Sequence, residues 1–270
     1  MTAALAAALG ALLCAGAAVA ATEAIDDLGR RITLARPAQR IVALSPHATE
    51  LVIAAGASDR LVGITAASDT PERLAAVPRI GGPGALDRER VLQLQPDLAV
   101  GWHSGNRAQD LDWLDRTGIA LFRSEPTDLA DIAATIRALG RLAGTKAVAD
   151  PAADAFVLGL RTPCAKYPPR PAYVVVWERP PMAIGGRHWI NDALRAAGFQ
   201  NQFAAHDAGA FAIAPEAILA AAGGAQRISL MPGLTGRAAE IADLLSRPGP
   251  QLPRAVQLLC ELRTAPWRER

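Results

Sequence analysis

The stretch Arg40–Leu51, RIVALSPHATEL, decides the fold. After Arg40, residues 41–44 form an apolar run, and we predict a buried β-strand over residues 40–44. Ser45 then offers an N-cap and Pro46 a first helical position, so we expect a helix that runs to Ala55 and stops at Gly56. A strand that leads directly into a helix is the repeating unit of α/β folds with parallel sheets.

The same unit recurs along the rest of the chain. Short apolar runs predict further strands at residues 61–65, 97–102, 119–123, 172–177 and 227–231. Apolar residues at helical spacing predict helices at residues 86–94, 107–117, 128–142, 146–160, 188–197, 215–222, 237–246 and 253–263. Pro151 should kink the helix in which it lies or delay its start.

The predicted strands fall into two groups along the chain, and the segment between the groups contains only predicted helices. We predict an N-terminal α/β lobe over residues 22–127, a helical segment over residues 128–165 and a C-terminal α/β lobe over residues 166–270. Both lobes are expected to be Rossmann-like, with mainly parallel sheets.

Composition excludes several classes of protein. Of the 270 residues, 51% are hydrophobic and 20% are charged, which is not the composition of a disordered chain. The 28 basic and 26 acidic residues leave a net charge of +2, which gives no electrostatic reason to expect nucleic acid as a partner.

The first 21 residues carry no charged side chain and end in Ala18-Val19-Ala20, the small-x-small pattern that signal peptidase reads. We therefore expect a signal peptide over residues 1–21 and a periplasmic protein. A buried or membrane-spanning helix is the alternative, because a run of this length can just cross a bilayer. Lipid anchoring at Cys14 is not expected, because the residue before it is the bulky Leu13.

Two cysteines, Cys164 and Cys260, remain after removal of the signal peptide. In an oxidising compartment they can form a disulfide, or they can remain as two buried thiols, and the sequence leaves both open. They form no CxxC metal or redox motif.

The loops that follow the predicted strands contain no catalytic motif. There is no GxSxG, GxGxxG, P-loop or HExxH sequence, so we expect a protein that is not an enzyme. The alternative is a metal-dependent or hydrolytic periplasmic enzyme, which would use His47 and His103 because both follow strand ends.

Aromatic residues make up only 4% of the chain, which makes their positions informative. Trp102 and Trp177 end predicted strands in different lobes, and Phe211 precedes a predicted helix. Large flat side chains at strand ends of two lobes are suited to line a cleft for a broad, partly apolar ligand. The alternative is that both tryptophans pack in the core.

At these residues the sequence resembles the periplasmic solute-binding proteins that deliver cobalamin to ABC importers, within a larger group that also binds ferric siderophores and haem. The resemblance is carried by Arg40–Leu51, Leu61–Asp69, Leu92–Trp102 with Ser104-Gly105-Asn106, Gly118–Leu129 and Trp177–Asp192.

The resemblance implies two lobes bridged by one long helix, with the ligand between them. Cobalamin, or a related corrinoid, is the implied ligand of a monomeric protein that docks on an inner-membrane ABC permease. Haem or a ferric siderophore is the alternative. Trp102 and Trp177 are expected to face each other across a shared crevice and pack on the corrin, and Phe211 to contact it from the second lobe. The other implied ligand-binding residues are Pro46, His47, Ser104, Gly105 and Asn106.

Two acidic residues match the positions at which members of this group dock onto arginines of the permease. Glu89 lies on the first lobe and Glu216 on the second. Carboxylates on both lobes would fix the orientation on a symmetric permease. The alternative is that both are ordinary acids of a first helical turn, which the helix dipole favours.

The chain also departs from the group's pattern. Ala66-Ala67 stand where an aromatic residue is often found, and the turn at 78–84 lacks one too. Ala197 replaces the cysteine that usually pairs with the position of Cys260, so that usual partner is missing. Residues 247–250 lead straight into the last helix, so we expect a C-terminal lobe one strand short and a cleft open on one side.

Overall fold

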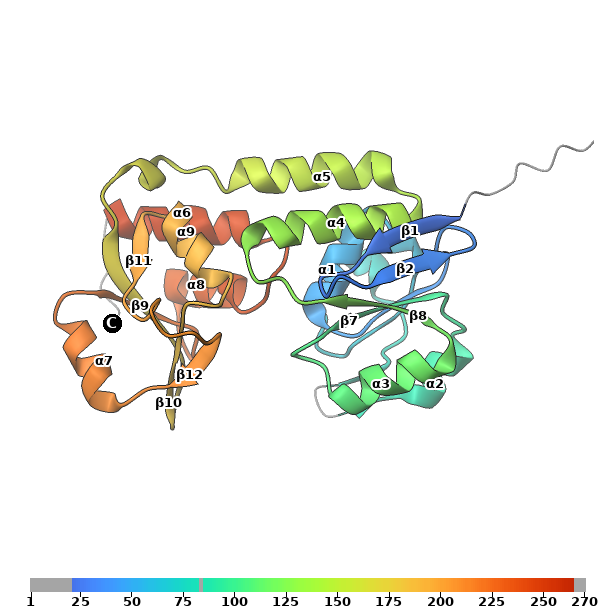
Figure 1. The fold of residues 1–270 in the computed structure, drawn as a ribbon, viewed down its shortest axis with the longest axis horizontal. Coiled ribbons are helices and arrows are strands. Elements are labelled where there is room, and N and C mark those ends of the chain that lie inside the picture. Colours follow the sequence, from blue (N-terminus) through green and yellow to red (C-terminus); the bar gives the residue numbers. More distant parts are fainter. Residues whose placement is uncertain (1–20, 83–84, 265–270) are drawn as a thin grey trace, which may run out of the picture.

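The structure, a computed structural model, describes residues 21–82 and 85–264. Two α/β lobes lie side by side, and helix α5 (Lys146–Gly159) leads from the first lobe towards the second along one side of the molecule (Figure 1). The predicted signal peptide falls almost wholly outside the described residues. Within those residues, no helix has the length and apolarity needed to cross a membrane.

The first lobe contains a four-stranded parallel sheet in the order β4-β3-β7-β8. Its strands are β3 (Ile41–Ala43), β4 (Leu61–Ile64), β7 (Leu98–Trp102) and β8 (Ala120–Ser124). Its helices are α1 (Pro46–Ala54), α2 (Arg88–Gln93) and α3 (Ala108–Thr117), with 3₁₀ turns at Ser58–Arg60 and Glu72–Leu74 and a small ribbon of β5 (Gly81–Gly82) and β6 (Ala85–Leu86).

Both faces of this sheet are buried, which explains why its strands are continuous apolar runs. Ile41 and Ala43 belong to a core cluster that extends into the helices and the second lobe. Val42 and Leu44 point to the other face and belong to a separate cluster with Leu111 of α3. Successive side chains of a strand alternate between faces, so one short strand supplies both cores.

Local capping signals set the helix boundaries as expected. The Ser45 hydroxyl accepts a hydrogen bond from the backbone N–H of Ala48 and caps α1, and Pro46 is its first residue. α3 is followed by Gly118 at φ 77°, a left-handed conformation that glycine adopts without steric cost.

An N-terminal hairpin of β1 (Thr22–Ile25) and β2 (Arg31–Leu34) was not predicted. Its turn residue Asp27 accepts hydrogen bonds from the Thr135 hydroxyl at 2.6 Å and the Glu125 N–H at 2.7 Å. Burial raises the pKa of Asp27. These contacts hold the hairpin against α4 (Leu129–Ala143) and the residue that follows β8.

Helices α4 (Leu129–Ala143) and α5 pack closely against each other. A Cβ atom added at Gly140 would lie 2.2 Å from the Cβ of Ala149, so only glycine allows this approach. Of the two effects expected of Pro151, a kink or a delayed start, the delayed start is not found, because α5 begins at Lys146 and continues past the proline.

The second lobe contains a five-stranded mixed sheet rather than a mainly parallel one. β9 pairs in parallel with β11 and β13, whereas β10 pairs antiparallel with both β9 and β12. The strands are β9 (Arg170–Glu178), β10 (Pro181–Ile184), β11 (Phe199–Asn201), β12 (Ala210–Ala212) and β13 (Gln226–Ser229). The helices are α6 (Ile190–Ala196), α7 (Pro215–Ala222), α8 (Gly236–Leu245) and α9 (Leu252–Thr264), with a 3₁₀ turn at Pro163–Lys166.

One edge of this sheet is formed by β13. Among the described residues it pairs with β9 alone, and the chain then passes through α8 and a short connection to α9. No further strand follows β13 in the described part of the chain.

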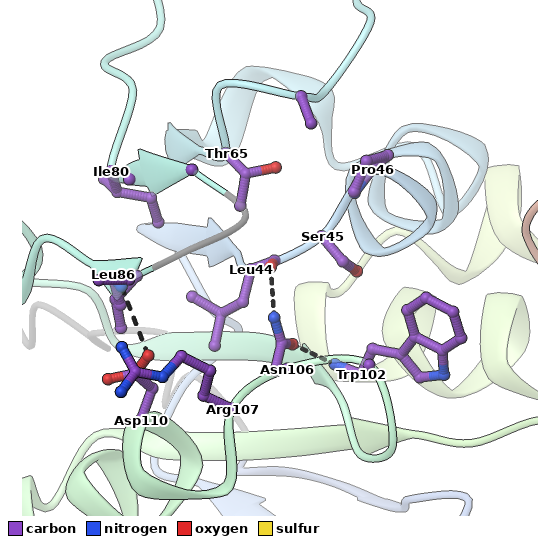
Figure 2. A pocket seen from close by; sticks show the side chains of 15 residues that line it. Leu44, Ser45, Pro46, Thr65, Ile80, Leu86, Trp102, Asn106, Arg107 and Asp110 are labelled. Carbon is purple, nitrogen blue, oxygen red and sulfur yellow. Dashed lines mark hydrogen bonds between the residues drawn. The ribbon is translucent and has the colours of Figure 1, made fainter. Parts of the chain in front are cut away.

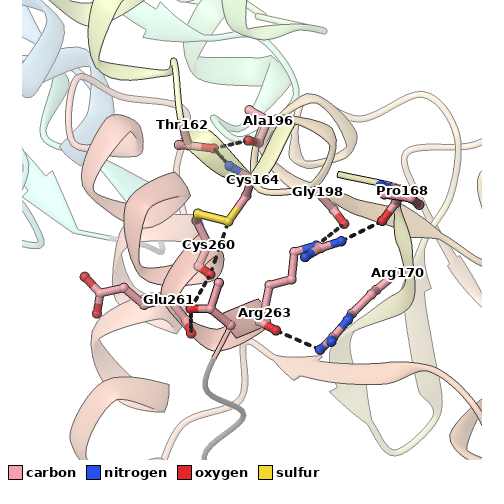
Figure 3. The surroundings of a disulfide bond; sticks show 10 residues. Thr162, Cys164, Pro168, Arg170, Ala196, Gly198, Cys260, Glu261 and Arg263 are labelled. Atoms are coloured by element: carbon pink, nitrogen blue, oxygen red, sulfur yellow. Dashed lines mark hydrogen bonds between the residues drawn. A yellow bond between two sulfur atoms is a disulfide. The ribbon is translucent and has the colours of Figure 1, made fainter. Parts of the chain in front are cut away.

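A disulfide joins Cys164 to Cys260 and thereby fixes α9 against the start of the second lobe (Figure 3). Of the two states that the sequence leaves open for these cysteines, the structure has the disulfide, although the family's usual partner of Cys260 is replaced by Ala197. Cys164 supplies the second sulfur from the 3₁₀ turn, beside Ala196, whose carbonyl accepts a hydrogen bond from the Thr162 hydroxyl at 2.6 Å. The two half-cystines are 96 residues apart, so the bond closes a large loop.

Candidate functional site

A cavity of about 280 Å³ lies between the two lobes. The first lobe contributes Trp102, at the end of β7. The second lobe contributes mostly apolar side chains from several elements, among them Val176, Ile184, Trp189, Leu230, Leu245 and Pro248. Open α/β sheets bind ligands beyond the carboxyl ends of their strands, which is where Trp102 lies. This cavity is therefore the candidate ligand site.

The turn after β7 holds Trp102 in place. The Asn106 side chain accepts a hydrogen bond from the backbone N–H of Trp102 at 2.6 Å and donates one to the Leu44 carbonyl at 2.7 Å, as Figure 2 shows. The indole lies directly over Gly105, where an added Cβ would come within 2.0 Å of the ring. Asn106 thus holds the backbone of Trp102, and the absence of a Cβ at Gly105 lets the indole lie against the turn.

His47 packs against Trp102 inside the protein and lines neither cavity that contains Trp102. Its ring meets the indole edge-on, with 4.8 Å between ring centroids and 87° between planes. The side chain is completely buried, so the expectation that His47 contacts the ligand is not met by this geometry. Burial, aided by the positive charge of Arg247, lowers the pKa of His47 to about 3, and the ring is neutral at physiological pH.

A second cavity, of about 230 Å³, lies within the first lobe and shares Trp102 with the first (Figure 2). Pro46, Gly105 and Asn106 line it, together with Ala67 and Ile80. The structure therefore brings these three predicted residues together with Trp102. Ser104 is exposed in the same turn, and its N–H donates to the Glu125 carboxylate at 2.9 Å.

Trp177 does not share a cavity with Trp102 in this structure. Its indole is 51% exposed and lines a separate cavity beside α7, with Pro215 and Leu219. Its neighbour Val176 lines the cavity between the lobes instead, because successive residues of β9 point to opposite faces. The expectation that the two indoles face each other across one crevice is thus not met, because no cavity among the described residues is lined by both Trp102 and Trp177.

Phe211 lies in β12, partly buried, and stacks on His206 with 4.0 Å between ring centroids. Its neighbour Ala210 lines the cavity between the lobes. Phe211 is therefore adjacent in sequence to a residue that lines the cavity, but its own ring is stacked against the His206 ring.

Glu89 and Glu216 are both exposed, in the first turns of α2 and α7. Figure 1 shows these helices in different lobes, both on the side of the molecule away from α5. The helices that carry the two glutamates thus lie on one side of the molecule.

The alternative of a metal site built on His47 and His103 finds no support in the geometry. His103 lies in an exposed turn, where its Nδ1 is 3.5 Å from the Arg123 guanidinium, whereas His47 is buried. Over residues 21–82 and 85–264, no three His, Cys, Asp or Glu side chains converge as a metal site.

Residues 41–257 match the periplasmic binding protein family. The chain belongs to this family.

Curated relatives share part of its length. A vitamin B12-binding protein from Vibrio cholerae serotype O1 is 33% identical over 171 residues, and one from Yersinia pestis is 33% identical over 173 residues. The first alignment covers 62% of each chain, and the second covers 63% of this chain and 62% of the relative. The chain thus aligns with less than two thirds of these relatives.

Solved structures extend the likeness. The periplasmic vitamin B12-binding protein of Vibrio cholerae has a TM-score of 0.71 and 26% identity, over 86% of this chain and 99% of that chain. A periplasmic haem-binding protein from Pseudomonas aeruginosa has a TM-score of 0.67 and 24% identity, over 84% and 94% of the two chains, and shows likeness of fold alone.

Sequence reasoning missed two residues at the cavity of this periplasmic binding protein. Trp189 and His188 both line it, just before α6. A signal was present, because Trp189 is one of only five tryptophans and lies inside the stretch Trp177–Asp192. Trp189 does not end a predicted strand, so the position that draws attention to Trp102 and Trp177 does not mark it.

Proposed function

We propose that this periplasmic binding protein captures cobalamin, or a related corrinoid, between its lobes and passes it unchanged to an ABC permease in the inner membrane. The observation that carries the proposal is the indole of Trp102, packed on Gly105, in the wall of an apolar cavity between the lobes, in a chain whose curated relatives are named vitamin B12-binding proteins. A rigid aromatic face suits a flat macrocycle, because stacking needs no further ordering of the side chain.

The size of the site fits partial enclosure of such a ligand. The cavity between the lobes, about 280 Å³, lies just below the roughly 300–1,000 Å³ of pockets that enclose drug-sized ligands. Trp102 also lines the first-lobe cavity, so a ligand seated on the indole can reach both. The remainder of a corrinoid would then stay in the opening between the lobes.

The remaining site residues have graded roles in this proposal. Pro46, Ser104, Gly105 and Asn106 form the rim and support of the Trp102 subsite. Trp177 and Phe211 contribute less to ligand binding than Trp102. The Trp177 indole lines the separate cavity beside α7, and the Phe211 ring is stacked on His206.

Docking and export complete the proposal. Glu89 and Glu216 contact basic residues of the permease, one from each lobe, which is supported by their exposure and their common side of the molecule. Residues 1–21 direct the chain to the periplasm, which is supported by their apolar composition. The protein acts as a monomer.

The test is retention of ligand through gel filtration. Purified protein is incubated with cyanocobalamin or, in parallel, with haemin or a ferric siderophore. We expect the visible absorption of cyanocobalamin to elute with the protein at a ratio near one. Retention of haemin or the siderophore with loss of cyanocobalamin would replace the proposal with the alternative ligand.

A further inference from the structure

His188 is a polar side chain on the otherwise largely apolar cavity between the lobes. It lies in the turn between β10 and α6 and is partly buried. Ser246 also lines this cavity, but its hydroxyl donates to the Asp243 carbonyl at 2.6 Å.

The imidazole of His188 is held from several sides. Its Nδ1 accepts a hydrogen bond from the Ile190 N–H at 3.2 Å, at the start of α6. The centroids of the His188 and Trp189 rings are 5.0 Å apart. The His188 ring also lies near Gly209, because a Cβ added to that glycine would be 3.9 Å from the His188 Cδ2. The His188 carbonyl in turn accepts from the backbone and side chain of Asn191, each at 3.0 Å.

These contacts fix the position of the proton on the ring. Burial lowers the pKa of His188 to about 4, so the imidazole is neutral near pH 7. Because Nδ1 uses its lone pair to accept the Ile190 N–H, the single ring proton resides on Nε2. Among the described residues, no hydrogen-bond partner of Nε2 is found.

We propose that the Nε2–H of His188 donates a hydrogen bond to an oxygen acceptor on the bound ligand, such as the carbonyl of a peripheral carboxamide. The inference rests on the proposed function, because a corrinoid carries such amides around its macrocycle. The same geometry excludes Nε2 as an axial ligand of a metal, since its lone pair is replaced by the proton. His188 therefore selects a ligand by its polar rim and not by its metal.

The test separates donation to the ligand from the hydrogen bond that His188 accepts from the Ile190 N–H at the start of α6. His188→Asn keeps a side-chain acceptor for the Ile190 N–H, because an asparagine oxygen accepts from the N–H two residues further on in an Asx turn, but the side chain is too short to reach the cavity. His188→Ala loses both. Cyanocobalamin affinity is measured by tryptophan fluorescence, and the melting temperature of each variant is measured without ligand.

We expect His188→Asn and His188→Ala to bind cyanocobalamin roughly five- to twentyfold more weakly than the wild type, the loss of about one hydrogen bond. Only His188→Ala should melt at a lower temperature. In ¹⁵N-edited spectra of the wild type, the Nε2-bound proton of His188 should remain and shift on addition of cyanocobalamin.

Two results would overturn the inference and leave the proposed function intact. One is wild-type affinity in His188→Asn, and the other is loss of the Nε2 proton on binding. If the wild type retains haemin, with a Soret band that changes in His188→Asn, His188 is a metal ligand and both proposals are wrong. If the wild type binds no cyanocobalamin at all, the proposed function fails first and the inference with it.

Discussion

Arg247 of the second lobe is paired with Glu50 of the first, with 2.7 Å between the arginine Nε and the glutamate Oε1. Both side chains are mostly buried, at 23% and 17% exposure. Arg247 lies in the short connection between α8 and α9, and Glu50 lies on α1. The connection thus binds one lobe to the other beside the ligand cavity, where Pro248 forms part of the wall.

Removal of this ion pair should destabilise the protein. Arg247→Leu leaves the Glu50 carboxylate buried without its partner, and we expect a loss of about 2 kcal/mol, below the roughly 3–5 kcal/mol found for fully buried pairs. Urea unfolding measures it. The matched control is Arg254→Leu, which breaks the more exposed pair with Glu240 and should cost at most about 1 kcal/mol. Equal losses of unfolding free energy in the two variants would show that the ion pair between the lobes stabilises the protein no more than the exposed pair.

Gly105→Ala should weaken ligand binding more than stability. The new Cβ would lie 2.0 Å from the Trp102 ring, so the indole must leave its present position. We expect about tenfold weaker binding of cyanocobalamin, equivalent to about 1.4 kcal/mol, and an altered tryptophan emission spectrum. Gly224→Ala is the control, because nothing lies within 4 Å of a Cβ there. Unchanged binding in Gly105→Ala would mean that the orientation of the indole is unimportant.

The buried His47 should make stability depend on pH. The folded-state pKa of His47, about 3, lies below the ordinary histidine pKa of 6.5, so between these values the unfolded chain binds a proton that the folded protein does not. Stability from this group is complete above pH 6.5 and decreases as the pH falls, by about 1.4 kcal/mol per unit. From pH 7 to pH 5, the wild type should lose about 2 kcal/mol more than His47→Gln. The same pH dependence in both proteins would contradict the assignment.

The disulfide should contribute strongly to stability. Closure of a loop between residues 96 apart restricts the unfolded chain, and removal of a native disulfide typically costs roughly 2–5 kcal/mol. We expect a loss of this size in Cys164→Ala, Cys260→Ala and the double variant alike. Additive losses in the double variant would show that the two sulfurs act independently.

Much of the fold could be predicted from local signals. Ser45 and Pro46 mark the start of α1, and Gly118 marks the end of α3, because capping and left-handed backbone conformations depend on the residues themselves. The strands β10, β11 and β12 have at most four residues each, too short for a periodic pattern, and their pairing depends on the rest of the sheet.

The candidate site was less predictable. Val176 and Trp177 are both apolar, so the sequence does not indicate which of them faces the cavity. His47 follows a strand end like a ligand-binding residue, yet it is buried behind Trp102. The pairing of Cys164 with Cys260 depends on how α9 returns to the second lobe, which no spacing rule gives.

The most direct test is titration of cyanocobalamin against tryptophan fluorescence in Trp102→Ala, Trp177→Ala and Trp113→Phe. Trp113 lies in α3, where it packs under Arg88, and serves as the control. We predict at least tenfold weaker binding in Trp102→Ala, a smaller loss in Trp177→Ala and wild-type binding in Trp113→Phe. Wild-type affinity in Trp102→Ala would contradict the account, because the ligand would then not lie against the indole between the lobes.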